Sequence, residues 1–206
     1  MDLSVLEKRV ADGDESALAE LFDRYRDRLR KVIVSRMDRR LRGRVDPSDV
    51  LQDAFIDLQS KLPSFDKIAG KMSMFVWMRL VAKERLLQVH RQHLNAEKRD
   101  ARKEVALKNV AQSNASSIFL AENLLGRFTT AGRDAIRHEM FQTLLSALQS
   151  LDAVDHEIIT MRCFEELSNA EAAESLGLSE NGASSRFVRA MSRLKERLSE
   201  IPGFLE

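Results

Sequence analysis

Ser168–Leu198, with the sequence SNAEAAESLGLSENGASSRFVRAMSRLKERL, is the stretch that decides the fold of this chain. Ser168 and Glu171 form an S-x-x-E capping box, a pattern that satisfies the free amide groups at a helix start. Gly177 supplies the left-handed residue that ends this helix, and Ser179 is placed to cap a second one. The stretch therefore predicts a short helix, a glycine turn and a longer helix.

The second helix carries an apolar stripe and a basic remainder. Residues at helical spacing form the stripe: Ala183, Phe187, Met191, Leu194 and Leu198. Serines and arginines lie off it: Ser184, Ser185, Arg186, Arg189, Arg193 and Arg197. Such a helix can enter a DNA major groove as the second helix of a helix-turn-helix, but a surface hairpin with a solvated basic face shows the same pattern. The stretch by itself leaves both interpretations open.

The whole chain predicts an all-α protein. It has 206 residues, of which 44% are hydrophobic and 32% charged, so it can bury real cores. Apolar residues recur at three-to-four spacing almost throughout, glycine and proline are few, and no convincing alternating strand is found.

Neither an enzyme nor a metal site is expected. Cys163 is the single cysteine, which excludes an internal disulfide and predicts a small core residue in a reducing cytoplasm. The histidines lack ligand spacing with it: His90, His93, His138 and His156. Since no phosphate-cradling glycine loop or nucleophile motif occurs either, no catalytic residue, cofactor or metal is predicted. No signal peptide or membrane-spanning run is recognised, so we expect a cytoplasmic location.

Charge is unevenly distributed although the net charge is only +1. Arginines crowd residues 24–44, and the next segment, Asp46–Asp57, carries carboxylates and no base. Blocks of this kind indicate surfaces for partners of opposite sign, although charge runs are more often solvated faces.

Two helices are predicted in the first third of the chain. One covers Ala17–Leu41 and ends at Gly43. The other starts at Asp46-Pro47-Ser48-Asp49, where Asp46 caps and Pro47 takes the first helical position, and runs to about Ser60. Within it Asp49, Asp53 and Asp57 stack at i, i+4 and i+8, a repulsion that a basic partner would relieve. A solvated acidic face is an equal alternative.

A loop over Leu62–Ser73 and a helix from Met74 to about His90 are predicted next. The helix has a second apolar stripe that contains Trp77, either core against another helix or a surface for unstacked bases. A basic continuation follows, and then a linker with one short helix over 105–138. Helices over Glu139–Gln149 and after Asp152 are predicted to pack beneath the helix-turn-helix.

Two separated motifs occur in a characteristic order: D-P-S-D-V-L-Q-D-A-F-I-D-L followed by F-V-W-M-R, and L-S-N-A-E-A-A-E-S-L-G-L-S-E near the C-terminus. Over nearly its whole length the chain resembles the extracytoplasmic-function sigma factors of bacterial RNA polymerase. The stretch ERLLQVHRQHLNAEKRDARKEV, with SS-x-FLAENLLG and LSNAEAAE, is most similar to a branch found in planctomycete-type bacteria.

The resemblance implies a non-enzymatic polymerase subunit with two small helical domains. Residues 1–104 would be sigma region 2, 105–138 an interdomain linker and 139–206 sigma region 4. The implied partners are core polymerase, through its β′ clamp and β flap, promoter DNA and, in many relatives, an anti-sigma factor. The acidic helix would bind the clamp through four residues: Asp49, Gln52, Asp53 and Ile56.

Both promoter elements receive candidate residues from the resemblance. Capture of flipped-out bases at the -10 element is assigned to Phe65, Lys71, Trp77, Arg79, Lys83 and Arg85. Reading of the -35 duplex is assigned to Ser184, Ser185, Arg186, Arg189 and Arg193, with Arg186 and Arg189 on guanine edges.

Two departures from the family and one alternative remain. Glu84 stands where relatives often have Asn, and its carboxylate would repel phosphate. Asn181-Gly182 lies in the first turn of the recognition helix, so either the backbone approaches DNA there or the helix starts late. The alternative function is a stand-alone helix-turn-helix regulator whose N-terminal bundle senses a ligand or dimerises.

Overall fold

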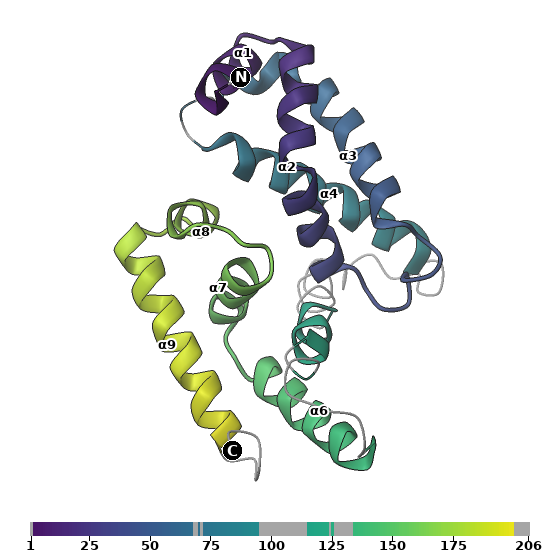
Figure 1. Cartoon of the computed structure of the whole chain (residues 1–206), viewed down its shortest axis with the longest axis vertical. Coiled ribbons are helices and arrows are strands. Elements are labelled where there is room, and N and C mark those ends of the chain that lie inside the picture. The colour runs from purple at the N-terminus through teal and green to yellow at the C-terminus, as the bar shows by residue number, and fades with distance from the viewer. Residues whose placement is uncertain are drawn as a thin grey trace, which may run out of the picture. The chain divides into compact units, whose positions relative to one another are not determined.

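The computed structural model describes residues 2–67, 70, 72–94, 115–123, 125 and 134–199. Most of these residues are helical, the others lie in turns, irregular segments or isolated bridges such as that between Arg42 and Val45, and no strand occurs among them. The all-α prediction is therefore confirmed. The chain divides into two compact units, Met1–Ala101 and Arg102–Glu206, which are treated separately (Figure 1).

The N-terminal unit is a small helical bundle. Its elements are α1 (Leu3–Ala11), α2 (Glu15–Arg36), α3 (Pro47–Lys61), the 3-10 helix η1 (Leu62–Lys67) and α4 (Met74–Leu94). α2 packs against α1, α3 and α4, and α3 packs against α4. Fully buried aliphatic and aromatic side chains join these helices: Leu6, Leu18, Leu21, Leu29, Ile33, Leu51, Leu58, Phe75 and Met78.

Local capping explains where α2 and α3 begin. The Asp14 carboxylate accepts hydrogen bonds from the backbone amides of Ser16 and Ala17. At the start of α3, the Asp46 carboxylate accepts from the Ser48 amide at 2.7 Å, and Pro47 takes the first helical position, as predicted.

The end of α2 differs from the prediction, which placed it at Leu41. The helix ends at Arg36 because Met37 is extended, with ψ 124°. Met37 and Leu41 are nevertheless buried, so an irregular segment satisfies the apolar pattern that suggested more helix. The Asp38 amide donates to His90 Nε2 at 3.3 Å, which attaches this segment to the end of α4.

Two further differences lie in the same unit. The predicted loop over residues 62–73 contains η1, whose Phe65 is buried. α1 was not predicted; it packs on α2 through Leu6 and Val10, which are spaced one helical turn apart.

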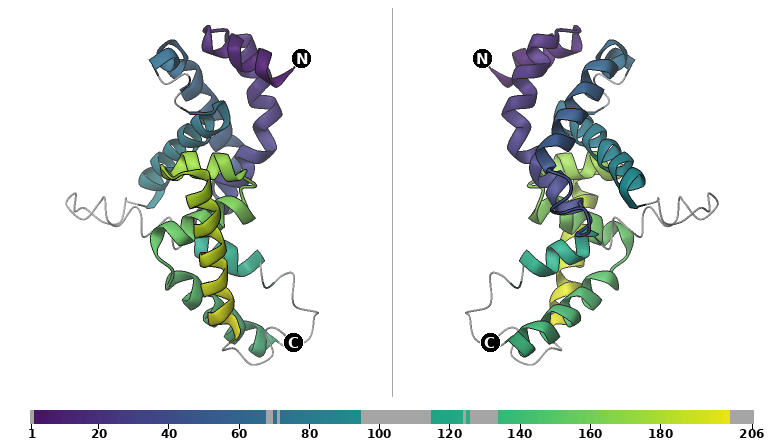
Figure 2. Two further views of the ribbon diagram at one scale, coloured as in Figure 1. Left: turned by 90° about the vertical axis from the view of Figure 1, so that its left-hand side faces the viewer. Right: turned by 90° about the vertical axis from the view of Figure 1, so that its right-hand side faces the viewer.

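The C-terminal unit contains the helix-turn-helix, which is formed by its last two helices. Its elements are a helical segment over 115–123, α6 (Asp134–Gln149), α7 (Ala153–Cys163), α8 (Asn169–Leu176) and α9 (Glu180–Ser199). α9, the yellow helix in Figure 2, packs against α7 and α6. One apolar core unites the unit: Leu120, Ala121, Leu125, Leu144, Leu148, Ile158, Ile159, Ala173, Ala183, Ala190, Leu194 and Leu198. The two helices predicted beneath the helix-turn-helix therefore pack there.

The short helix predicted between residues 105 and 138 is integrated into this core. Leu120, Ala121 and Leu125 are buried in it, and the Ser117 hydroxyl hydrogen-bonds His156 Nε2 at 2.8 Å. α6 begins at Asp134, earlier than the predicted Glu139.

The helix-turn-helix has the predicted local structure. Ser168 and Glu171 form both bonds of the capping box, and Gly177 ends α8 with φ +65°. The predicted apolar stripe of α9 is wrong at Met191, which is exposed, whereas Ala190 is buried. One residue along a helix rotates the side chain by about 100°, so the buried line passes through 190 instead of 191.

The prediction for Cys163 is also wrong, because its side chain is exposed at the C-terminal end of α7. The core-facing positions of that helix lie earlier, at Ile158, Ile159 and Met161. Across the described ranges, no helix combines the length and apolarity needed to cross a membrane. Nor do three His, Cys, Asp or Glu side chains gather there in a way that could hold a metal ion.

Candidate docking face and nucleic-acid interface

The four side chains assigned to polymerase docking share one exposed face of α3. Asp49, Gln52, Asp53 and Ile56 follow helical spacing and are all exposed, while Val50, Leu51, Ala54 and Leu58 bury the opposite face. Ile56 is 56% exposed, a large apolar side chain among carboxylates. This combination can bind a basic surface that also offers an apolar contact.

Asp57 ends the acidic column and is held within the protein. Its carboxylate accepts from Arg85 Nε at 2.7 Å and also pairs with Arg85 Nη2, which joins α3 to α4. The hydrogen bond from this guanidinium to Asp57 raises the pKa of Arg85. The predicted repulsion among Asp49, Asp53 and Asp57 is thus reduced at Asp57 by an arginine of the same protein.

Glu84, the departure from the family pattern, also has a partner. Its carboxylate pairs with Lys61 Nζ at 2.5 Å, a second contact between α3 and α4. The negative charge that would repel phosphate is therefore partly compensated.

The side chains assigned to the -10 element do not form one exposed surface. Trp77 and Phe65 are 4% and 3% exposed, and their rings lie 4.5 Å apart in the core. Arg79 is buried, Lys83 is half-buried and Arg85 is paired with Asp57. Lys71 lies outside the described residues. In this structure Trp77 and Phe65 pack the bundle, and their contact with bases stays a prediction.

The structure at the start of the recognition helix excludes one of the two explanations given for Asn181-Gly182, a late helix start. α9 begins at Glu180, so the helix does not start late. The Gly182 amide donates to Ser179 Oγ at 3.1 Å, and a Cβ on Gly182 would meet the same oxygen at 3.0 Å. The glycine leaves room for the capping hydroxyl. The Asn169 side-chain amide also donates to the Glu180 carbonyl at 2.8 Å, which links the starts of α8 and α9.

An exposed face of α9 is available for DNA. Ser184, Ser185 and Arg189 are exposed on it, as the sequence predicted. Val188, which the sequence analysis did not single out, is 59% exposed beside them. An apolar residue off the buried stripe was the signal that would have found it.

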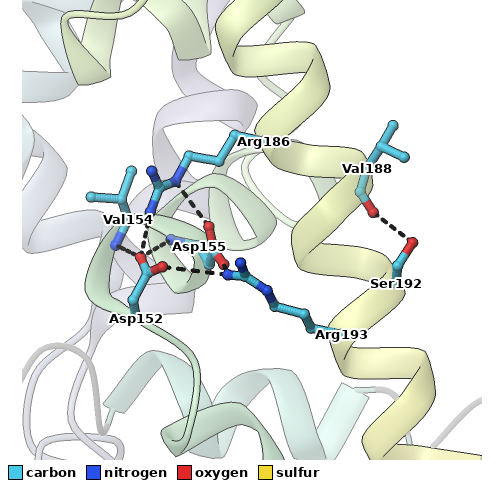
Figure 3. A network of polar contacts seen from close by, with 7 residues as sticks. All are labelled: Asp152, Val154, Asp155, Arg186, Val188, Ser192 and Arg193. Atoms are coloured by element: carbon cyan, nitrogen blue, oxygen red, sulfur yellow. Dashed lines mark hydrogen bonds and ion pairs between the residues drawn. The ribbon is translucent and has the colours of Figure 1, made fainter.

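The other two predicted -35 arginines turn toward α7. Arg186 Nη2 bonds Asp152 Oδ1 at 2.7 Å, and Arg186 Nε lies 2.8 Å from Asp155 Oδ1 as an ion pair that is not a well-aligned hydrogen bond (Figure 3). Arg193 Nη1 pairs with Asp155 and lies 3.6 Å from Asp152 Oδ2. The guanidinium groups predicted to reach DNA are engaged with carboxylates here.

The two carboxylates differ in environment. The Asp155 side chain is 2% exposed, whereas that of Asp152 is 48% exposed and also caps α7 through the amides of Val154 and Asp155. Partial burial alone would raise the pKa of Asp152, but hydrogen bonds from the Asp155 amide and Arg186 outweigh it and lower the pKa. The same contact raises the pKa of Arg186. Sequence analysis found Asp152 only as a cap and missed Asp155.

Comparison with known protein families finds a match in the C-terminal part of the chain. The family model for sigma-70 region 4 matches residues 141–194. The matched residues include α8 and most of α9, so this part of the chain is similar to sigma-70 region 4. No curated protein sequence matches the chain significantly.

The fold of the whole chain has a solved counterpart. It is similar to a chain in the structure of CnrH in complex with the cytosolic domain of CnrY, with a TM-score of 0.52. The likeness covers 95% of this chain and 96% of that chain at 21% sequence identity. At this identity the comparison establishes the all-α fold.

Proposed function

We propose that the chain is a sigma factor of the extracytoplasmic-function type, a non-enzymatic subunit that directs RNA polymerase to promoters. The observation that carries the proposal is the match of residues 141–194 to the family model for sigma-70 region 4. The likeness to the CnrH structure extends over both units, so the rest of the chain fits the same kind of protein.

The α3 face is the proposed contact with core polymerase. Asp49, Gln52, Asp53 and Ile56 are exposed and free of the packing that fixes Asp57, and a basic site on the β′ clamp would complement them. On this proposal residues 1–104 are sigma region 2, 105–138 link the domains and 139–206 act as region 4. A contact between region 4 and the β flap belongs to the same proposal.

Promoter recognition is divided between the two units. α9 would enter the major groove of the -35 element, with Ser184, Ser185 and Arg189 toward the DNA. The -10 element would be captured as a single strand near the start of α4. Trp77 and Phe65 would shape this region from the core, and Lys83 is a candidate for the strand itself.

Copurification and transcription test the proposal directly. The tagged chain should copurify with bacterial core polymerase and should support initiation from discrete sites in vitro. A chain that protects duplex promoter DNA equally well with and without core polymerase would instead favour the stand-alone regulator.

The Asp53→Arg variant tests the docking face. Reversal of this exposed charge should weaken binding to core polymerase by tenfold or more, about 1.4 kcal/mol or above, and leave thermal unfolding unchanged. Asp27→Arg, on an exposed position of α2, is the matched control. Equal losses in both variants would indicate a general charge effect and contradict docking through α3.

Two finer assignments stay predictions. CnrH in the similar structure is bound to the cytosolic domain of CnrY, and we propose a protein inhibitor of the anti-sigma class for this chain. Membership of the planctomycete-type branch rests on the resemblance of residues 84–105, of SS-x-FLAENLLG and of LSNAEAAE.

A further inference from the structure

The two arginines that α9 turns toward α7 form a closed network with two carboxylates. Arg186 and Arg193 contribute two positive charges, and Asp152 and Asp155 contribute two negative charges, so the network is neutral as a whole. Its centre is Asp155, whose side chain is 2% exposed and contacts both guanidinium groups. A buried carboxylate needs such partners, because an uncompensated charge there would be strongly unfavourable.

Helical spacing gives α9 three longitudinal strips. Ala183, Ala190 and Leu194 face the core, and Arg186 and Arg193, seven residues apart, face α7. The exposed strip begins with Ser184, Ser185, Val188, Arg189 and Ser192, and it continues toward the C-terminal end of the helix with Lys195 and Glu196. The network therefore holds the edge of α9 that lies beside its core-facing strip.

The exposed strip has the chemistry of a major-groove reader. The Ser192 hydroxyl donates to the Val188 carbonyl at 3.0 Å, which leaves its oxygen as an acceptor (Figure 3). Val188 offers a methyl surface that suits thymine, and a serine or arginine can bond base edges or phosphates. In the N-terminal half of α9 this strip carries only one charge, that of Arg189, so the orientation of the strip matters more there than its electrostatic attraction to DNA.

We propose that Asp155 is a positioning residue for DNA recognition. By holding Arg186 and Arg193 it fixes the rotation of α9 about its axis, so that Ser184, Ser185, Val188 and Arg189 face the -35 duplex. The inference rests on the proposed function, since it concerns how region 4 reads DNA. It assigns Arg186 and Arg193 to the support of the recognition helix and not to direct base contact.

A competing interpretation predicts the opposite change in DNA binding when the Asp155 charge is removed. If Asp152 and Asp155 only mask arginines that DNA later recruits, then removal of the Asp155 charge would free positive charge and strengthen binding to any duplex. If Asp155 positions α9, its removal should lower sequence discrimination and leave the non-specific attraction equal or larger.

The Asp155→Asn variant of the full chain, bound to bacterial core polymerase, distinguishes these views. The probe is a pool of random-sequence duplex fragments long enough to hold both promoter elements, from which bound fragments are selected and sequenced. The wild type should recover an upstream and a downstream motif. In Asp155→Asn the enrichment of the upstream motif should fall about tenfold, the size of one lost base contact, while the downstream motif is kept.

Arg186→Lys provides a second variant in case Asp155→Asn folds poorly. Lysine keeps the charge for a phosphate but cannot bridge two carboxylates with a planar fork, so positioning predicts the same loss of the upstream motif. Arg197→Lys, an exposed change on α9 outside the network, is the matched control and should recover both motifs.

Each outcome decides something. Unchanged upstream enrichment in both variants, or tighter binding of Asp155→Asn with the motif intact, would overturn the positioning role alone. A wild-type chain that recovers neither motif would overturn the proposed function and this inference with it. Loss of both motifs in a folded Asp155→Asn would also contradict the inference, because the effect should be confined to the upstream element.

Discussion

Glu166 is the one non-glycine residue of the described chain with a positive φ, +57°. It lies between α7 and α8, where the backbone turns toward the helix-turn-helix. A side chain with a Cβ pays about 1 kcal/mol for the left-handed region, and glycine does not. The turn is therefore a place where a single residue stores strain.

Glu166→Gly should stabilise the C-terminal unit by about 0.5 to 1 kcal/mol, because relief of the strain outweighs the added freedom of the unfolded chain. Urea unfolding monitored by circular dichroism measures the difference. Glu166→Ala is the control, since alanine keeps the Cβ and should give no gain. A destabilised glycine variant would show that the contacts of the Glu166 side chain matter more than its backbone.

Trp77 is a core residue in this structure. Its side chain is 4% exposed and packs against the Phe65 ring. Trp77→Ala should destabilise the N-terminal unit by about 3 to 5 kcal/mol, because truncation leaves a large cavity. Chemical unfolding of the full chain would reveal this loss, and an unchanged unfolding curve would argue for a side chain that faces the strand. Trp77→Phe, which fills most of the space, should retain most of the stability.

At the level of elements, α3 and α4 are joined by charge as well as by packing. Asp57–Arg85 and Lys61–Glu84 both link the proposed docking helix to the helix proposed to approach the -10 strand. α3 presents its exposed carboxylates outward and uses Asp57 to hold its neighbour. One face of α3 is thereby left exposed for the proposed docking, and another face holds α4.

A double-mutant cycle of Asp57→Asn and Arg85→Gln should give a coupling of about 1 kcal/mol in unfolding free energy, near the upper end for exposed pairs, since both side chains are partly buried and doubly bonded. The Arg24–Glu20 pair on α2 is a suitable comparison, being a single surface contact at i, i+4. We expect its coupling to be a few tenths of a kcal/mol. Equal couplings in the two cycles would mean that Asp57–Arg85 adds nothing beyond a surface pair.

At the scale of the whole molecule, each unit combines its own core with its own outward face. In the N-terminal unit the α3 face stands opposite the buried stripe of the same helix. In the C-terminal unit the core reaches beyond the matched residues 141–194, since Leu120 and Leu125 belong to it. Part of the expected linker thus stabilises the domain that follows it.

The response of stability to pH follows from groups in the N-terminal unit. Burial lowers the pKa of His90 below its ordinary 6.5, and the bond from the Asp38 amide requires an unprotonated Nε2. Because the unfolded chain takes up this proton first, stability should begin to fall as pH drops through about 6.5. Backbone and side-chain hydrogen bonds lower the pKa of Asp14 and Asp46 below 3.8, so a second loss should follow below that value.

Urea unfolding free energies measured between about pH 8 and pH 3 test this two-step decline. His90→Gln keeps an acceptor for the Asp38 amide and cannot be protonated, so it should abolish the first step and keep the second. A wild-type curve that is flat around pH 6.5, or a first step that persists in His90→Gln, would contradict the assignment to His90.

The sequence by itself determined the helical class, the starts of α3, α7 and α8, and the helix-turn-helix. Ser168, Gly177 and Asp46 act on amides a few residues away, so their effect can be predicted from adjacent letters. The exposed α3 face followed equally from helical spacing.

Only the tertiary structure decided which side chains are buried by, or paired with, residues that are distant in the sequence. It buried Trp77 against Phe65, left Cys163 exposed and kept Met37 and Leu41 in the core without a helix. It also turned Arg186 toward Asp152 and Asp155 while Arg189 stayed exposed. The physical reason is that a long side chain can pair with any suitable group that folding brings close to it. The spacing of residues along one helix does not show which other helix will lie beside that side chain.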